Sequence, residues 1–237
     1  MTVSIGGATI AGGVTIGDAG VGGSIAFDGT SQYLSVPYSA GGGFDFGSQD
    51  FTIEFWMYPT SGGNAAKGLM AIPHNAGNYA QALWFFPTAT SLAFYSSGSG
   101  TSWDVASGPS AGTPSLNTWN HVAASKSGSS IRLFFNGILQ STVTFAGTFT
   151  GTYDRVWIGN TTGNGNYGGL LTNIRVVKGT AVYTSNFTPP TQPLFAISGT
   201  SLLLKASSSA SLVTDSSGNN LTVTNINSAT YSTNTPF

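Results

Sequence analysis

Apolar and polar residues alternate in short runs along most of the chain, with turn residues between the runs. The clearest run is FTIEFWMYP, in which Phe51, Ile53 and Phe55 fall on one face and Thr52, Glu54 and Trp56 fall on the other. A period of two with aromatic and β-branched residues is typical of a β-strand. We expect the first set to point into a core between two sheets and the second set to point outward.

Further strand-like runs follow at regular spacing. The run HVAASK is separated from IRLFFNG by the turn residues 127–130, and Asn136-Gly137 then leads into ILQSTVTFA. Asn-Gly is a strong hairpin signal because both residues tolerate the positive φ of a type I′ turn. Other runs lie at residues 155–160, 170–179, 200–206 and 220–226. No segment shows helical periodicity, so the pattern predicts an all-β fold of two packed antiparallel sheets.

Residues 1–23 differ from the rest because glycine recurs every few positions and Asp18 is the one charge. Their strand-like patches contain Val3, Ile5, Ile10, Val14 and Ile16. One interpretation is a flexible leader, as is common at termini. The other is a partner-binding arm that donates β-strands to a neighbour. Its apolar, uncharged character is unusual for a solvated tail, so we expect part of the arm to be ordered against another subunit.

The charged fraction is 6% and the formal net charge is −1, whereas about 25% of residues are charged in an average globular protein. Seven basic residues cannot build the basic surface that phosphate-backbone or polybasic membrane binding needs. We therefore expect no nucleic acid and no membrane among the partners. Low charge favours association, so the composition indicates a component of a large assembly, with a Ser/Thr-rich secreted lectin as the alternative.

Several segments occur in an order that resembles a known family. IAFDGTSQYLSVP, FTIEFWMYP, WNHVAASKSGSSIRLFFNGIL, RVWIGN and GGLLTNIRVVKGTAVYTSNFTPPTQP are similar to elements of the laminin-G-like, concanavalin A-like jelly-roll sandwiches over about residues 24–195. The tail at residues 200–237 is similar to segments that accompany such domains in structural proteins of marine bacteriophages, notably cyanophages. The resemblance implies one jelly-roll sandwich at residues 24–237, to which residues 200–237 contribute strands.

Catalysis has little support in this sequence. Glycosidases that this fold resembles carry E-x-D-x-x-E on one strand, because retaining hydrolysis needs two carboxylates about 5 Å apart. Here Glu54 is the single glutamate, and Trp56 and Met57 follow where further carboxylates would stand. Glu54 is expected to be a strand residue with a local partner, and His121 a structural residue at a strand start. His74 is expected in a loop, and no histidine spacing indicates zinc. We expect no enzyme and no catalytic residues.

Calcium is implied by the resemblance, because laminin-G-like sandwiches sometimes hold this ion at a loop rim. The candidate ligands are Asp28, Asp104, Asp154 and Asp215. They are widely separated, and no D-x-D-x-D cluster is present. Asp28 and Asp215 precede residues typical of Asx turns. We therefore expect no metal and no cofactor, with a structural calcium ion as the alternative.

Glycan binding without catalysis needs an aromatic stacking face beside amide or carboxylate groups. The loop at residues 74–79 offers Asn75, Asn78 and Tyr79, and the loop at residues 96–114 offers Trp103 and Asp104. The segment 160–167 could join them. The competing interpretation is that Trp103 packs its own loop onto the sandwich.

The resemblance to phage proteins implies a non-enzymatic virion structural protein. The leading hypothesis is a capsid decoration (cement) protein on the capsid surface. Its partners would then be the major capsid protein or neighbouring copies. The alternative is a glycan-binding adhesin module of a tail fibre or appendage, with surface glycans as partners. Copy number distinguishes them, since decoration requires hundreds of copies in each particle.

Overall fold

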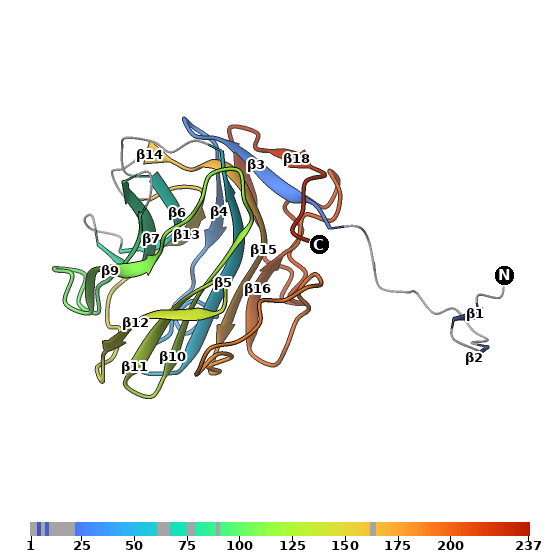
Figure 1. Ribbon diagram of the computed structural model, residues 1–237. Helices are drawn as coiled ribbons and strands as arrows, with labels where there is room; N and C mark the ends of the chain where they lie inside the picture. The colour runs from blue at the N-terminus through green and yellow to red at the C-terminus, as the bar shows by residue number, and fades with distance from the viewer. Residues whose placement is uncertain are drawn as a thin grey trace.

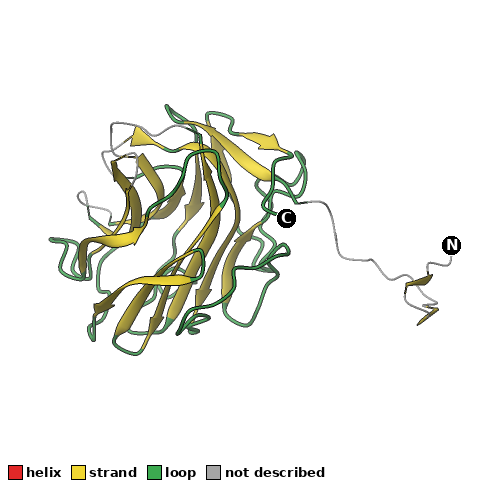
Figure 2. Ribbon diagram, viewed as in Figure 1, coloured by secondary structure: helices red, strands yellow, loops and turns green. Residues whose placement is uncertain are grey.

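The computed structural model describes residues 4–5, 8–9, 22–60, 67–74, 79–88, 91–161 and 165–237. Strands and loops make up this part of the chain, and it contains no helix (Figure 2). Among these residues no helix therefore has the length and apolarity of a membrane span. The all-β class predicted from the sequence pattern is confirmed.

Two eight-stranded sheets pack face to face (Figure 1). The first sheet has the order β12 (Ile138–Thr144), β11 (Ser130–Phe135), β10 (Asn120–Ser127), β5 (Phe51–Pro59), β15 (Gly168–Lys178), β3 (Ser24–Asp28) and β18 (Thr230–Ser232), and β16 (Thr200–Leu204) also pairs with β15. All its pairings are antiparallel.

The second sheet has the order β17 (Thr224–Ile226), β4 (Tyr33–Pro37), β13 (Arg155–Ile158), β6 (Lys67–Pro73), β7 (Ala80–Thr88), β8 (Ser91–Ser96) and β9 (Ala106–Gly112). β14 (Gly165–Asn166) adds a short parallel pairing to β6, and the other pairings are antiparallel. The jelly-roll sandwich of two antiparallel sheets is therefore confirmed, with this one parallel exception.

The core lies between the sheets. Phe51, Ile53 and Phe55 of β5 belong to it, as the alternation predicted, and Leu34 and Phe94 reach it from the second sheet. Each of these side chains is at most 1% exposed. Burial of large apolar side chains between two sheets is the main stabilising contribution in such a fold.

The other face of β5 differs from the expectation. Thr52, Glu54 and Trp56 point away from the core, but they do not reach solvent: Thr52 and Glu54 are completely buried. The segment that follows β15 covers them, because the backbone oxygen of Thr180 accepts a hydrogen bond from Thr52 Oγ1 at 3.0 Å. Near the C-terminus, the Phe237 ring lies 6.0 Å from that of Trp56. The first sheet is thus covered on both faces at β5.

The hairpin between β11 and β12 turns at Asn136 and Gly137, whose φ angles are 49° and 78°. Both are in the left-handed region that the Asn-Gly signal predicts for a type I′ turn, so this prediction is confirmed. A Cβ atom on Gly137 would lie 1.9 Å from the backbone oxygen of Phe187. The covering segment therefore also requires a glycine at this position.

Strands from the tail enter both sheets. β16 pairs with β15 and β18 pairs with β3 in the first sheet, while β17 pairs with β4 in the second. Figure 1 shows β16 and β18, in orange and red, beside the earlier strands of the first sheet.

At the N-terminus, β1 (Ser4–Ile5) pairs antiparallel with β2 (Ala8–Thr9). Ile5 lies in β1, whereas Val3, Ile10, Val14 and Ile16 lie outside the described residues. The partner-binding role of these positions stays a prediction.

Candidate functional site

Three loops meet beside the second sheet. The backbone NH of His74 donates to Tyr79 O at 2.9 Å, which closes the connection between β6 and β7. Ser97 NH donates to Ala80 O at 2.8 Å, and Thr150 NH donates to Gly98 O at 3.0 Å. These bonds tie together His74, Tyr79 and the segments 97–104 and 150–154, and we call this set the loop rim.

Three half-buried aromatic side chains lie together at this rim, and we call Tyr79, Tyr95 and Trp103 the aromatic cluster. The Trp103 ring centroid lies 5.0 Å from that of Tyr79 and 5.2 Å from that of Tyr95, both in edge-on geometry. Tyr95 and Trp103 pack over the small buried residues Ala71 and Ala80. Trp103 therefore anchors its loop, as one interpretation held, and keeps part of its surface exposed.

Asp104 follows Trp103 and is exposed. Its carboxylate accepts a hydrogen bond from the backbone NH of Gly98 at 2.8 Å. Burial alone would raise the pKa of Asp104, but hydrogen bonds from Ser99 and Gly98 outweigh it and hold the pKa below its usual range. An ionised carboxylate that can accept hydrogen bonds thus follows Trp103 directly in the chain.

The His74 side chain is buried beneath the loop rim, where it packs against residues of the neighbouring segments. It is 7% exposed, and its ring centroid lies 4.5 Å from that of Tyr153, with which it also forms a β-bridge. Burial lowers the pKa of His74, so the ring is neutral at pH 7. A Cβ atom on Gly151 would lie 1.6 Å from the ring, and one on Gly100 would lie 2.5 Å from it. His74 is therefore a packed residue at the base of the loops.

The structure thus brings Tyr79 together with Trp103, which Asp104 directly follows, although Tyr79 comes from a different loop in the sequence. Asn75 and Asn78 lie outside the described residues. Tyr167, which the segment 160–167 could have added, is 1% exposed and belongs to the core, because its ring packs against Phe27 instead.

Tyr95 was missed in the sequence analysis. The alternation in SLAFYS carried the signal, since Leu92 and Phe94 face the core. Tyr95 therefore falls on the opposite face of β8, where it meets Trp103.

A row of residues extends from Tyr95 of the aromatic cluster across the second sheet. The strand register places Trp157, Ala71, Leu83 and Tyr95 in one row across β13, β6, β7 and β8. Trp157 is half-buried, and the Arg155 guanidinium lies 5.6 Å from its ring centroid. The row therefore begins and ends on an aromatic residue.

Glu54 lies on β5 of the first sheet, where its carboxylate is buried and fully hydrogen-bonded. Its Oε1 accepts hydrogen bonds from Arg175 at 2.9 and 2.6 Å, and its Oε2 is bonded to His121 at 3.1 Å and to the Tyr183 hydroxyl at 2.8 Å. Burial would raise the pKa of Glu54, but bonds and charges from His121, Arg175 and Tyr183 lower it. Glu54 is fully buried, so the expected structural roles of Glu54 and His121 are confirmed.

The four candidate calcium ligands have partners within the protein. Asp28 accepts hydrogen bonds from the backbone NH groups of residues 30–32, and Asp215 accepts one from Ser217 NH. Both form the Asx turns that the sequence predicted.

Asp154 pairs with Arg155, and Asp104 bonds to Gly98. Within the described ranges, no three His, Cys, Asp or Glu residues come together to hold a metal ion.

A family model described as the concanavalin A-like lectin/glucanases superfamily matches residues 28–182. The chain therefore belongs to this superfamily, and the laminin-G-like resemblance of its sequence is confirmed. No curated protein matches the chain. The matches link it to no bacteriophage protein.

Among solved structures, a protein from Bacteroides ovatus described as a carbohydrate-binding candidate is similar, with 15% identity and a TM-score of 0.57. The similarity covers 89% of this chain and 62% of that one, so the chain spans less than two thirds of its length. Domains LG4-5 of mouse laminin α1 share 14% identity, with a TM-score of 0.48, over 71% of this chain and 47% of that one. At these identities the likeness shows the fold alone.

Proposed function

We propose that the protein is a non-enzymatic glycan-binding module that uses the aromatic cluster. The observation that carries this proposal is that Tyr79, Tyr95 and Trp103 stay partly exposed beside the ionised Asp104. An aromatic face packs well against the C–H face of a sugar ring, while a carboxylate accepts hydrogen bonds from sugar hydroxyls. The description of the Bacteroides ovatus protein as a carbohydrate-binding candidate supports the same assignment.

The non-enzymatic part of the proposal rests on Glu54. Retaining glycosidases need a pair of carboxyl groups on either side of the scissile bond. The single glutamate of this chain is completely buried, and both its oxygens are occupied by Arg175, His121 and Tyr183. A sugar cannot reach this carboxylate without displacing the segment that covers it.

A binding experiment with two tryptophan variants tests the proposal. The protein is screened on an array of neutral and acidic glycans, and the strongest ligand is titrated by calorimetry. We expect Trp103→Ala to weaken binding at least about tenfold, which corresponds to about 1.4 kcal/mol. Trp119→Ala is the matched control, because Trp119 is also half-buried but packs against Tyr58 on the other sheet. No binding to any glycan, or equal losses in both variants, would contradict the proposal.

One observation favours a second candidate, a structural role in an assembly. β12 forms an edge of the first sheet and has no charged residue. Its Ile138 and Leu139 are 52% and 40% exposed. Natural edge strands usually carry charges or proline that prevent pairing with another chain. The backbone NH of Leu139 is bonded to Asn186 Oδ1 at 2.9 Å, so it is the part of β12 after Leu139 that suits strand addition by a neighbouring molecule. The virion decoration role and the location on a capsid or tail appendage stay predictions that this edge supports.

Particle composition tests the second candidate. Hundreds of copies of the chain in each purified virion would support decoration, and a few copies at a tail would support the adhesin alternative. Deletion of residues 2–20 should reduce incorporation if the N-terminal arm supplies the added strand. Normal incorporation of the deleted form would exclude that role for the arm.

A further inference from the structure

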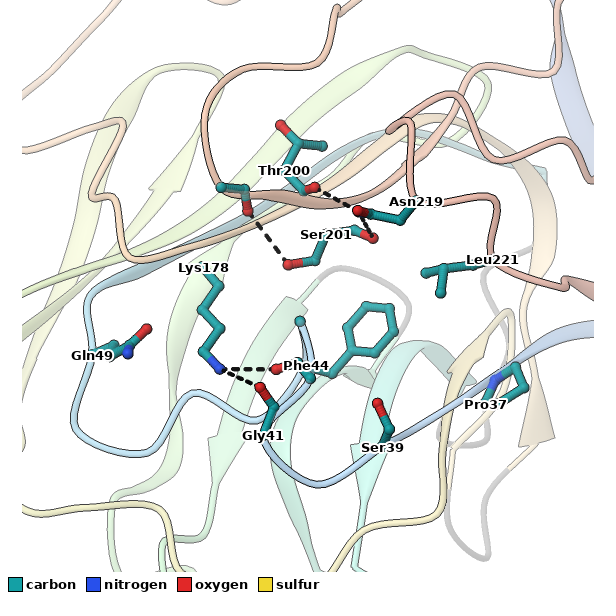
Figure 3. Close-up of a pocket in the computed structure, with 13 residues that line it drawn as sticks. Pro37, Ser39, Gly41, Phe44, Gln49, Lys178, Thr200, Ser201, Asn219 and Leu221 are labelled. Atoms are coloured by element: carbon teal, nitrogen blue, oxygen red, sulfur yellow. Dashed lines mark hydrogen bonds between the residues drawn. The ribbon is translucent and has the colours of Figure 1, made fainter.

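A hollow in the structure shares no lining residue with the aromatic cluster. Its volume is about 640 Å³. The loop after β4, the end of β15, the start of β16 and the tail near residue 219 surround it (Figure 3). We call it the lysine pocket, after Lys178, which is its one charged lining residue.

Lys178 is held in place by the backbone. Its Nζ donates to Gly41 O at 3.2 Å and to Gly42 O at 2.9 Å, as Figure 3 shows. An ammonium group has three hydrogens to donate, so one hydrogen is left after these two bonds. Among the described residues Lys178 takes part in no ion pair, and the lining contains no carboxylate. Asp45 lies on the same loop, but its carboxylate accepts the backbone NH of Gly41 at 2.8 Å and does not line the pocket. The ammonium of Lys178 is therefore the one charged group that the pocket presents to a ligand.

The other walls supply neutral hydrogen-bonding groups. Asn219 Nδ2 donates to the backbone oxygens of Thr200 and Ser201 at 2.9 and 3.1 Å. These bonds fix the orientation of the carboxamide. Ser39 adds an exposed hydroxyl group on the facing loop, and the Phe44 ring forms part of the floor (Figure 3).

The loop after β4 and the strand β16 form two walls of the pocket, and their backbones lie close together. A Cβ atom on the glycine at position 43 would lie 2.5 Å from the Ser201 side chain, so the loop approaches β16 as closely as a glycine allows. Lys178 fixes the same loop through two carbonyl groups. The pocket is therefore formed before any ligand arrives, which lowers the entropic cost of binding.

We propose that the lysine pocket binds a sugar residue that bears one anionic substituent, a carboxylate or a sulfate. The ammonium of Lys178 would pair with the anion, and the Ser39 hydroxyl and Asn219 carboxamide would bond to ring hydroxyls. A single cation suits one negative charge, whereas phosphate groups are usually held by several cationic or NH donors. The proposal extends the proposed function, because it assumes that the ligand is a glycan, but it concerns a different surface.

Amide chemical shifts of the labelled protein locate the ligand directly. The probes are a galacturonic acid disaccharide, a galactose disaccharide of the same linkage, and a galactose disaccharide that bears one sulfate. We expect the two acidic probes to shift the amide signals around Lys178 and Asn219, with at least about tenfold higher affinity than the neutral probe. The ratio between the two acidic probes tells which anion the pocket prefers.

Charge variants test the role of Lys178. Lys178→Met should weaken acidic-probe binding at least about tenfold. Lys67→Met is the matched control, because Lys67 Nζ also donates to a backbone oxygen, that of Gly29, at 2.9 Å. If Lys178→Met fails to fold, salt provides the second measurement. Raising sodium chloride should weaken acidic-probe binding to the unmodified protein and leave neutral-probe binding unchanged.

Several outcomes would overturn the proposal. They are equal affinity for neutral and acidic probes, equal losses in the two lysine variants, and equal binding of sodium acetate or sodium sulfate alone. Acidic-probe shifts confined to the surroundings of Trp103 would refute the lysine pocket while supporting the proposed function. Conversely, shifts at Lys178 that survive Trp103→Ala would support the pocket even if the aromatic cluster binds nothing.

Discussion

Glu54 shows how a single buried charge depends on its neighbours. Arg175, His121 and Tyr183 all contact its carboxylate. Replacing both members of a buried ion pair by apolar residues is often tolerated, whereas removing one member leaves the other charge uncompensated. This cluster joins β5, β10 and β15 to the segment that covers them.

We therefore predict that Glu54→Gln lowers the free energy of unfolding by about 3–5 kcal/mol. The variant keeps the size of the side chain but leaves the Arg175 guanidinium without its anionic partner. Urea unfolding followed by tryptophan fluorescence measures the loss. The double variant with Arg175→Met should recover part of it. A loss below about 1 kcal/mol in the single variant would show that the cluster contributes little.

His74 makes stability depend on pH. Its pKa in the folded protein lies below the ordinary value of 6.5, chiefly because burial disfavours the cation. As pH falls through about 6.5, the unfolded chain binds a proton at this site while the folded protein does not. The contribution of His74 is thus present above that pH and decreases as the pH falls toward the folded pKa.

Urea midpoints at pH 7.5 and pH 5.5 check this prediction. The unmodified protein should lose more stability between the two pH values than His74→Gln, because the variant lacks the titrating ring. Comparison of the two proteins cancels the contributions of all other groups. The same loss in both would show that His74 is not the source of the pH dependence.

At the scale of the strand, the sequence pattern predicted correctly those features that depend only on residues close together in the chain. The alternation along β5 placed Phe51, Ile53 and Phe55 in the core, and the Asn136-Gly137 pair placed the turn between β11 and β12. These outcomes depend only on the pleat of a strand and on positive φ.

Contacts between distant segments could not be predicted in the same way. Thr52 was expected at the surface because nothing in its own strand shows that Thr180 and Val182 bond to its hydroxyl group. Tyr95 and Trp103 are close only because β8 and the loop after it fold back across the second sheet. The lysine pocket joins β15 to the loop after β4 and to the tail, which no local pattern relates.

The row across the second sheet leads to a prediction about ligand length. Trp157 on β13 and Tyr95 on β8 are separated by three strand spacings, or about 14 Å. If a glycan bound at the aromatic cluster extends across the strands, its far end should reach Trp157. We expect Trp157→Ala to weaken binding of a hexasaccharide by about fivefold or more, and to leave binding of a disaccharide unchanged. Calorimetry with both lengths measures this, and equal effects on the two would exclude an extended path.

The last 38 residues, 200–237, contribute strands to both sheets. β16 brings Leu202 and Leu204 into the core and pairs with the centrally placed β15. β17 and β18 add strands to the two opposite sheets. Removing the tail would expose β15 and β3 as unpaired edges, which are prone to aggregation. A segment of this size could not fold alone either, because below about 40 residues domains usually need disulfides or metals, and the chain has no cysteine.

We therefore predict that a truncated protein of residues 1–199 aggregates, or remains compact without fixed side-chain packing. Loss of near-UV circular dichroism with retained far-UV signal, together with dye binding to exposed apolar surface, would identify the second state. A milder variant separates the core contribution from the edge contribution: Leu202→Ala should cost about 2–5 kcal/mol while the edges stay paired. A soluble 1–199 form with an unchanged melting temperature would show that residues 24–199 fold without the tail strands.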